Sequence, residues 1–365
     1  MKVLVAGDRG YIGAVMVPFL RAAGHQVSGL DLGLYEGCDF GSGPEDVGAR
    51  PFRDIRDADA SQMAGCDAVV CLAALSNDPL GDLNPAATYS VNLDGTLALA
   101  RAAKQAGVRR FLFASSCSLY GAVGSAAVAE DAAMVPVTAY GAAKLAAERE
   151  LAVLATDAFS PVYLRCATAY GVSPRLRLDI VVNNLTAVAV TEGRVHLESD
   201  GSAWRPLVHV EDICRAFLAV LEGPLERVHD EVFNVGRAQD NVQVCDIAEL
   251  VRAAVPGSRI SFADAAGPDL RNYRVDFSKL NETFPDLNLR WSVRDGIGEL
   301  ARAYTNYGMT YDDFVSSRFV RLRRIRDLLS AGLLDDMLRR QAGEHVRSQS
   351  ANRAGGSLMR SPASG

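Results

Sequence analysis

Gly7-Asp8-Arg9-Gly10-Tyr11-Ile12-Gly13 directly follows a short apolar stretch, Lys2–Ala6, and opens a helical pattern over Tyr11–Ala23. Glycines at these positions let the backbone approach a ligand, and a helix that begins here presents free N–H groups to a phosphate. Asp31 closes the next predicted strand, 18 residues after Gly13. A carboxylate there accepts hydrogen bonds from ribose hydroxyls and repels a 2′-phosphate. The stretch therefore predicts a strand–turn–helix unit that binds NAD in preference to NADP, through Gly7, Gly10, Tyr11, Ile12, Gly13 and Asp31.

Further residues along the first half are candidates for contact with the same cofactor. Asp54 and Ile55 are placed to flank the adenine. Leu72, Ala73 and Ala74 end a predicted strand with small residues that permit close approach. Asn92 lies within a predicted helix, where asparagine is a poor helix former. It therefore either binds a neighbouring strand or contributes to the cofactor site.

Short apolar strands alternate with longer amphipathic helices as far as about residue 170. This alternation predicts an α/β fold, a Rossmann-type doubly wound parallel sheet with helices on both faces. The predicted strands are Lys2–Ala6, Gln26–Asp31, Ala68–Leu72, Arg110–Ala114 and Val162–Cys166, and the main helices are Tyr11–Ala23, Pro85–Ala106 and Tyr140–Leu154.

The rhythm changes to shorter units after Gly171, which predicts a smaller α/β lobe that binds substrate. Its elements are expected at 179–191, 195–198, 207–210, 244–254, 259–262 and 293–305, with a strand at 231–235 that returns to the first sheet. The expected division is an NAD-binding domain at 1–173 with a return segment at about 207–236, a substrate lobe at 174–206 and 237–311, a basic helical extension at 312–340 and a disordered tail at 341–365.

Tyr140 and Lys144 lie four residues apart, hence on one helical face. A lysine ammonium favours the phenolate form of a nearby tyrosine, which can then act as a base on a hydroxyl. The segment Ser115-Ser116-Cys117-Ser118-Leu119-Tyr120-Gly121 follows a predicted strand and supplies a hydroxyl to the same substrate oxygen.

In this order, and after the glycine motif, these features resemble the extended short-chain dehydrogenase/reductase family, specifically its nucleotide-sugar epimerases and dehydratases. The resemblance covers about residues 1–310. It implies NAD as cofactor, Tyr140 as catalytic base, Lys144 as the residue that holds the nicotinamide ribose, and Ser116 as the catalytic hydroxyl. It also implies a nucleotide-diphosphate sugar as substrate and a homodimer as the assembly.

The resemblance further implies substrate-binding roles for several residues. In Trp204-Arg205-Pro206-Leu207-Val208-His209, Arg205 matches a residue that grips the sugar-nucleotide phosphates, whereas His209, on an apolar strand, is expected to be structural. The loop Gly171–Asp179 is similar to that of GDP-heptose 4-dehydrogenases. The candidate substrate-binding residues are Asp78, Ser118, Arg175, Arg177, Asn183, Arg205 and Arg271.

Departures from the family pattern narrow the expected activity. Dehydratases carry an Asp-Glu pair where this chain has Cys117 and Ser118, and decarboxylases usually carry Glu at the second of these positions. In 3,5-epimerases a cysteine exchanges protons at carbon, but it lies one position closer to the following tyrosine than Cys117 does. The expected activity is therefore 4-epimerisation through transient oxidation. The alternatives are a 4-dehydrogenase that releases a keto sugar and, less favoured, a dehydratase, a 3,5-epimerase or a non-catalytic NAD-binding protein.

Composition excludes several classes of partner. The formal charge is −6 and the pI about 5.5, so no global basic field recruits nucleic acid or anionic lipid. The longest apolar run, Ala68–Leu75, is too short to span a membrane, and the apolar residues before Gly7 are too few for a signal peptide, which predicts a cytoplasmic protein. Seven cysteines without a Cys-x-x-Cys pair predict neither a disulfide framework nor a metal site.

The charge is unevenly distributed along the chain. Residues 312–365 carry ten arginines and six acidic residues, a net +4, against −10 for the remainder. Since every catalytic candidate lies in the acidic part, the basic extension is expected to lie outside the ligand site. Its arginines and apolar residues at Arg318–Arg326 predict a helix that either docks onto an acidic face of its own or a partner subunit or is simply solvated.

Overall fold

The computed structural model describes residues 1–43, 51–76, 84–121, 126–264, 267 and 272–341. Its centre is a six-stranded, entirely parallel sheet with the strand order β10-β6-β4-β3-β1-β2. The strands are β1 (Lys2–Ala6), β2 (Gln26–Leu30), β3 (Ala68–Cys71), β4 (Arg110–Ser116), β6 (Ser160–Cys166) and β10 (Val232–Val235). All five strands predicted for the first half are present, with ends that differ by at most two residues.

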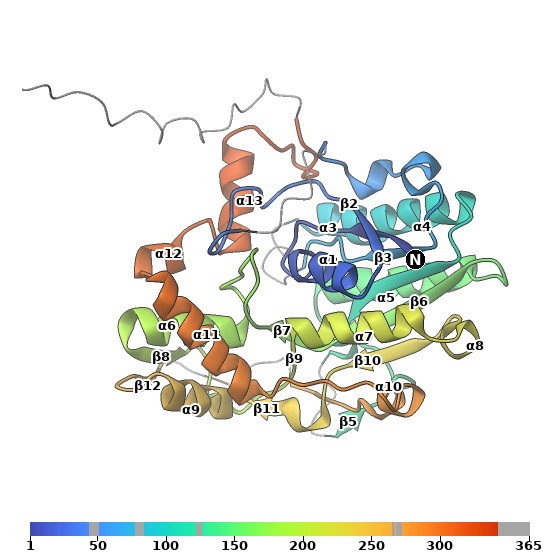
Figure 1. Cartoon of the computed structure of the whole chain (residues 1–365). Coiled ribbons are helices and arrows are strands. Elements are labelled where there is room, and N and C mark those ends of the chain that lie inside the picture. Colours follow the sequence, from blue (N-terminus) through green and yellow to red (C-terminus); the bar gives the residue numbers. More distant parts are fainter. Residues whose placement is uncertain (44–50, 77–83, 122–125, 265–266, 268–271, 342–365) are drawn as a thin grey trace, which may run out of the picture.

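Helices cover both faces of this sheet, as a doubly wound fold requires (Figure 1). On one face α1 (Gly13–Ala22) packs beside α7 (Val210–Glu222), and both share an apolar core with the sheet. On the other face α4 (Thr96–Gln105) and α5 (Ala139–Leu154) form a second core. Strands buried on both faces read as continuous apolar runs, which is why β1 and β3 were recognisable in the sequence.

The helix expected over Pro85–Ala106 is interrupted. It consists of α3 (Pro85–Tyr89), a π-helical segment at Ser90–Gly95, and α4. Asn92 lies in the π segment, where its side-chain oxygen accepts from the Leu75 N–H at 2.8 Å and its nitrogen donates to the Leu75 carbonyl at 3.0 Å. The asparagine thus holds the backbone that follows β3. Its side chain does not line the ligand cleft, so of the two roles that the sequence left open the structure shows the contact with the chain beside β3.

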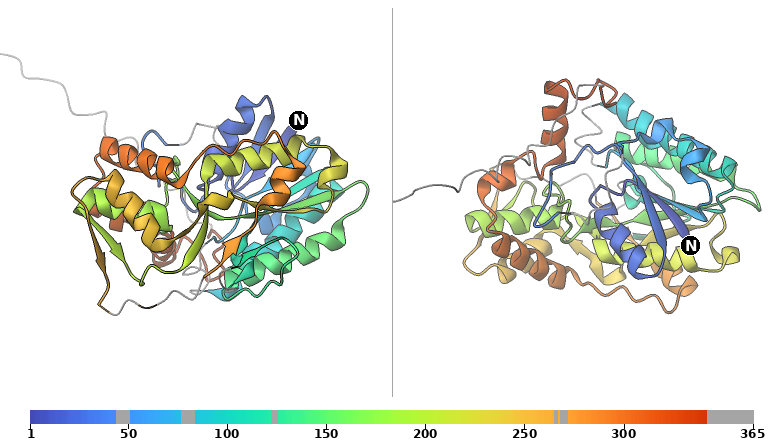
Figure 2. Two further views of the ribbon diagram at one scale, coloured as in Figure 1. Left: turned by 90° about the horizontal axis from the view of Figure 1, so that it is seen from below. Right: turned by 45° about the horizontal axis from the view of Figure 1, so that its top comes forward.

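A second lobe lies beside the sheet, at the end of the molecule opposite the N-terminus (Figure 2). It contains a three-stranded sheet ordered β11-β9-β7 and a parallel pair, β8 with β12, packed against three helices. Because β9 pairs with β7 and β11, the return to the main sheet begins at α7 rather than at residue 207. The elements are β7 (Thr168–Tyr170), α6 (Val181–Glu192), β8 (Arg194–Leu197), β9 (Trp204–His209), β11 (Asn241–Gln243), α9 (Val244–Ala254), β12 (Arg259–Phe262) and α11 (Val293–Tyr307).

Short elements complete the described chain. They are β5 (Ala127–Val128), which pairs with β13 (Arg274–Val275), the helices α8 (Leu225–Val228) and α10 (Ser278–Thr283), and 3₁₀ turns at Ile55–Asp57, Ala60–Met63, Cys117–Tyr120 and Ala238–Asp240. None of the helices in the described part is long and apolar enough to cross a membrane. All seven cysteines are free thiols, and the described residues contain no cluster suited to a metal ion.

The C-terminal extension, residues 312–340, folds back onto its own chain. It contains most of α12 (Tyr311–Val315), then α13 (Arg321–Ser330) and a bridge between Leu334 and Arg340. In Figure 1 α13 stands beside the loops that follow β2. The apolar side of the extension forms a core of its own with residues from these loops and from α3. Its arginines mainly bind backbone carbonyls there, and Arg339 pairs with Asp57 at 2.7 Å.

Candidate active site

A cleft of about 930 Å³ opens at the carboxyl ends of the main-sheet strands. The turn after β1, the ends of β2, β3 and β4, and the start of α5 form one side of it, and the second lobe forms the other. In a parallel sheet this edge is where ligands bind, because the loops there diverge to opposite faces. Seventeen of the residues predicted from the sequence to bind ligand line this one cleft: Gly7, Gly10, Tyr11, Ile12, Gly13, Asp31, Asp54, Ile55, Leu72, Ala73, Ala74, Ser116, Ser118, Tyr140, Lys144, Arg177 and Arg205.

Two glycines of the turn after β1, Gly7 and Gly13, have no room for a Cβ. Gly7 has φ +89°, and a Cβ there would lie 2.7 Å from the Ala73 nitrogen. A Cβ on Gly13 would lie 2.1 Å from the Gly7 carbonyl oxygen. The helix that follows has no side-chain cap at its N-terminus, and the N–H groups of Ala14, Val15 and Met16 donate to the backbone carbonyls of Gly10 and Ile12. The turn therefore packs closely on the chain that follows β3, and it places the start of α1 in the cleft wall, where a helix N-terminus favours a phosphate.

Asp31 lies at the end of β2 beside this turn. Its carboxylate accepts from the N–H of Gly33 at 2.6 Å and of Arg9 at 3.2 Å. Burial raises the pKa of Asp31 to about 6. Asp54 lies next to it in the cleft wall, held by an ion pair with Arg56. A buried carboxylate with remaining acceptor capacity suits neutral hydroxyl donors such as those of a ribose.

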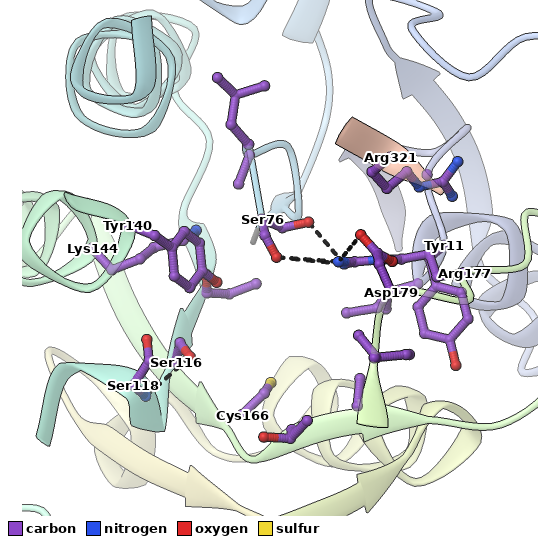
Figure 3. Close-up of a pocket in the computed structure, with 18 of the residues that line it drawn as sticks. Tyr11, Ser76, Ser116, Ser118, Tyr140, Lys144, Cys166, Arg177, Asp179 and Arg321 are labelled. Carbon is purple, nitrogen blue, oxygen red and sulfur yellow. Dashed lines mark hydrogen bonds and ion pairs between the residues drawn. The ribbon is translucent and has the colours of Figure 1, made fainter. Parts of the chain in front are cut away.

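Tyr140 and Lys144 project from the first two turns of α5 into the opposite end of the cleft (Figure 3). The helix begins after Thr138, whose hydroxyl accepts from the Gly141 N–H. Lys144 is 1% exposed, and its ammonium donates to the Ala114 carbonyl at 2.7 Å and lies 6.0 Å from the centre of the Tyr140 ring. Burial lowers the pKa of Lys144 to about 8. An ammonium in this position stabilises negative charge on the tyrosine oxygen.

Serines at the end of β4 face this pair (Figure 3). The Ser116 hydroxyl accepts from the Ser118 N–H at 3.2 Å, which fixes its orientation at the start of a 3₁₀ turn. The Ser115 and Ser118 hydroxyls are buried and have no hydrogen-bond partner within the described part of the chain. Buried hydroxyls in a cleft are normally satisfied. These two therefore indicate where ligand atoms bind.

Cys117 does not line the cleft. Its thiol donates to the Arg165 carbonyl at 3.1 Å, and burial raises its pKa well above the usual range. A thiol that exchanges protons with a sugar carbon needs access to the sugar and a thiolate form. The structure provides neither for Cys117, so the 3,5-epimerase hypothesis loses its candidate residue.

Two of the predicted substrate-binding residues lie outside the cleft. The buried guanidinium of Arg175 pairs with Asp39 and Glu36, and Asn183 binds the Gly171 N–H at 3.0 Å. Both hold the loop after β7 in place, which corrects the expectation of direct contact with substrate. The sequence alone could not distinguish Arg175 from Arg177, because two loop residues that are two positions apart can point in unrelated directions. Asp78 and Arg271 lie outside the described residues.

Arg177 lines the cleft as predicted, but its contacts there were not expected from the sequence. Arg177 donates to the Ser76 hydroxyl at 2.9 Å and pairs with Asp179 at 2.9 Å, so all three share one wall (Figure 3). Lining residues that were not predicted from the sequence include Tyr35, His196, Glu198, Ser199, Tyr273, Arg321 and Leu338. The Arg-x-Asp spacing is visible in the sequence, but nothing there links it to Ser76. Arg321 and Leu338 belong to the extension, which was expected to lie outside the ligand site.

His209 occupies a structural position, as expected. Its ring is buried, stacks on Trp291 at 4.1 Å and contacts the Glu299 carboxylate at 3.0 Å. These contacts join β9 to α11 within the second lobe.

Residues 3–236 match the model of a family described as NAD dependent epimerase/dehydratase. The chain belongs to this family. A UDP-glucose 4-epimerase from Lactobacillus helveticus is 29% identical over 273 residues, 69% of this chain and 82% of its own. A dTDP-glucose 4,6-dehydratase from Streptomyces niveus is 28% identical over 322 residues, 83% and 93% of the two chains. The structure of MoeE5 in complex with UDP-glucuronic acid and NAD has a TM-score of 0.72 at 27% identity, covering 85% of this chain and all of MoeE5.

The chain is accordingly an NAD-dependent enzyme of the nucleotide-sugar epimerase/dehydratase type. The cleft fits the cofactor of this family on its own evidence. Two glycines of the turn have no space for a Cβ, the N-terminus of α1 has no side-chain cap, and unsatisfied serine hydroxyls lie near Tyr140. Gly7–Gly13 and Asp31 would hold the diphosphate and ribose, and Lys144 the second ribose.

The low pKa of Lys144 predicts a basic limit to the activity of this epimerase/dehydratase family member. Below pH about 8 the ammonium is present, and above it the charge that supports a Tyr140 phenolate is lost. We expect kcat/KM to fall roughly tenfold per pH unit above pH ~8. Initial rates across pH 6–10 measure this limit. The Lys144→Met variant, with low residual activity, should lack it; an identical alkaline decline in that variant would assign the limit to another group.

Proposed function

We propose that the protein is an NAD-dependent nucleotide-sugar 4-epimerase that oxidises C4 of the sugar transiently. The observation that carries the proposal is the composition of the catalytic end of the cleft. Tyr140, Lys144 and Ser116 are together there, whereas Cys117 and Ser118 stand where a dehydratase carries its acid pair. Among the described residues, the acids that line the cleft are Asp31, Asp54, Asp179 and Glu198.

Each of these four carboxylates lies in another part of the cleft or is already paired. Asp31 and Asp54 lie at the adenosine end, Asp179 is paired with Arg177, and Glu198 lies in the second lobe. Elimination of water from a sugar needs a general acid and a general base beside the leaving group in addition to the oxidising tyrosine. A simple oxidation and reduction at C4 needs only Tyr140 and its supporting groups, which favours epimerisation over dehydration.

The proposed mechanism uses Tyr140 as the base. Its phenolate takes the proton of the O4 hydroxyl while the hydrogen on C4 leaves with its electron pair. The acceptor of that hydride, and later its donor, would be the nicotinamide of NAD held by Gly7–Gly13, Asp31 and Lys144. Lys144 keeps a positive charge beside the phenolate, and Ser116, fixed by the Ser118 N–H, hydrogen-bonds the same substrate oxygen. The keto sugar then flips in the site so that hydride returns to its other face, and Tyr140 gives its proton back to O4.

In this proposal a residue of the second lobe binds the nucleotide part of the substrate. Arg205 lines the cleft, with one guanidinium nitrogen donating to the Trp204 carbonyl at 2.8 Å. A fixed guanidinium suits a diphosphate, because it presents several donors in one plane. We assign Arg205, Arg177 and Ser118 to the substrate. Roles for Asp78 and Arg271 stay predictions, as do the homodimer and the cytoplasmic location.

The test is a product analysis in deuterium oxide. UDP-, GDP-, dTDP-, CDP- and ADP-sugars are incubated with the purified protein, and products are identified by NMR. We expect one sugar nucleotide to be inverted at C4 with no deuterium on carbon. Net consumption of NAD with release of a keto sugar would replace the proposal with a 4-dehydrogenase. Deuterium at C3 or C5, or loss of water, would overturn it in favour of carbon-acid chemistry.

A further inference from the structure

The C-terminal extension reaches the ligand cleft. Arg321, the first residue of α13, and Leu338, beyond the helix, both line it. The family match ends at residue 236, and MoeE5 is covered completely by 85% of this chain. The extension lies outside the matched family segment, so a role for it in the cleft is not implied by the family.

The Arg321 side chain is almost fully buried, which is unusual for an arginine. Its side chain is part of a residue only 3% exposed, and its guanidinium lies 3.7 Å above the centre of the Tyr35 ring. One terminal nitrogen, Nη2, donates to the Arg175 carbonyl at 2.8 Å. The other, Nη1, is buried without any hydrogen-bond partner among the residues the structure describes. A buried charged donor left unsatisfied is costly, so it indicates a missing acceptor.

The surroundings of Arg321 favour an anionic acceptor. Arg177, which we assign to the substrate, lies nearby and is paired with Asp179, whereas Arg321 has no carboxylate partner among the described residues. Stacking on Tyr35 satisfies the face of the guanidinium but none of its N–H groups. An oxygen anion bound at this end of the cleft would supply an acceptor for the Arg321 guanidinium and balance its charge.

The position of Arg321 in the cleft favours the diphosphate of the dinucleotide over that of the sugar nucleotide. Figure 3 shows it beside Tyr11 of the glycine turn, across the cleft from Tyr140 and Ser116. Tyr35, over which it lies, follows Asp31 by four residues at the adenosine end of the cleft. Arg205, the candidate for the sugar nucleotide, belongs instead to β9 of the second lobe. The diphosphate of the dinucleotide is therefore the anion that the glycine turn presents to this wall.

The rest of the extension is anchored over the same end. Arg340 donates to the carbonyls of Leu32 at 2.7 Å and Gly33 at 2.6 Å, directly after Asp31, and stacks on Phe52. Arg56, the ion-pair partner of the cleft residue Asp54, donates to the Met337 carbonyl at 2.7 Å. These contacts hold the extension against the residues that follow Asp31 and beside Asp54, at the adenosine end of the cleft.

We propose that the extension is part of the cofactor site, with Arg321 donating to the diphosphate of NAD, and that it keeps NAD bound between turnovers. The inference needs only the NAD dependence of the family. It also extends the proposed function, because an epimerase has to retain its cofactor while the keto sugar flips in the site.

The test measures exchange of bound NAD in the full-length holoenzyme. Protein that carries unlabelled NAD is mixed with an excess of isotopically labelled NAD, and native mass spectrometry follows the replacement. We expect Arg321→Met to exchange NAD about 10- to 100-fold faster than the wild type, the loss typical of a hydrogen bond to a charged group. Arg326→Met is the matched control, because Arg326 is an exposed arginine of the same helix. It should exchange NAD at the wild-type rate.

Binding of UDP tests whether Arg321 contacts the diphosphate of NAD or the diphosphate of the sugar nucleotide. Titration of the holoenzyme with UDP should give the same affinity for Arg321→Met and wild type. Equal NAD exchange in Arg321→Met and wild type would overturn the proposal. Weakened UDP binding with unchanged NAD exchange would also overturn it and would assign Arg321 to the sugar nucleotide.

Hydrogen–deuterium exchange of the wild type tests the extension without a variant. Peptides from residues 312–340 should exchange more slowly with NAD bound than after its removal, and equal exchange would contradict the proposal even if Arg321→Met failed to fold. The outcome is separable from the proposed activity. A wild type that releases a keto sugar would refute the epimerase, while the comparison of NAD exchange between wild type and Arg321→Met would still be decisive for the extension.

Discussion

Replacing Tyr140 with phenylalanine is expected to lower kcat by on the order of 10²–10⁴-fold. The variant loses only the hydroxyl that takes the O4 proton, while the ring remains near the Lys144 ammonium and keeps its place on α5. NAD content and the affinity for the sugar nucleotide should therefore change little. Steady-state kinetics, native mass spectrometry for bound NAD and calorimetry for substrate binding measure the three quantities separately.

Tyr307→Phe is the control for this substitution. Tyr307 lies on α11, packs against Phe40 in the second lobe and does not line the cleft. Removing its hydroxyl should leave kcat within about twofold of the wild type. If Tyr140→Phe also retained nearly full activity, the proton would be taken by another group and the proposed mechanism would be wrong.

Replacing Gly13 with alanine is expected to abolish stable NAD binding. The added Cβ would lie 2.1 Å from the Gly7 carbonyl oxygen and 2.7 Å from the Asp8 Cα, and both of these are backbone atoms. Overpacking typically costs about 1–3 kcal/mol and occasionally more, and here the glycine turn has to open to relieve it because the clashing atoms are backbone. We expect the purified variant to carry less than about a tenth of the wild-type NAD and to melt at a lower temperature.

Gly298→Ala provides the matched control on another helix. Gly298 lies within α11, and its added Cβ would meet only the mobile end of the Arg302 side chain, at 3.2 Å. Alanine in a helix interior is favoured over glycine by about 0.5–1 kcal/mol. This variant should keep its NAD and melt no lower than the wild type. Full NAD content in Gly13→Ala would show that the turn adjusts and that its tight packing is not required.

The main-sheet strands were predictable because each is a short apolar run bounded by turn residues. β1 has the predicted limits, and β4 extends two residues further, to Ser116. The long helix was predicted without its π segment, because hydrophobic periodicity does not reveal a local change in the backbone hydrogen-bond pattern. Asn92 was conspicuous as a poor helix former, but its partner, the Leu75 backbone, is a contact that depends on how the loop after β3 folds.

The sequence by itself determined the cofactor turn and the catalytic group, since each is a local arrangement. Three glycines after a strand fix the turn, and a spacing of four residues places Tyr140 and Lys144 on one side of a helix. Only the tertiary structure decided which arginines face the cleft. Arg175 and Arg177 are near neighbours that turn to different partners, and Arg321 reaches the Arg175 carbonyl across 146 residues of sequence. Long side chains in loops and on amphipathic helices have no fixed direction until distant segments pack around them.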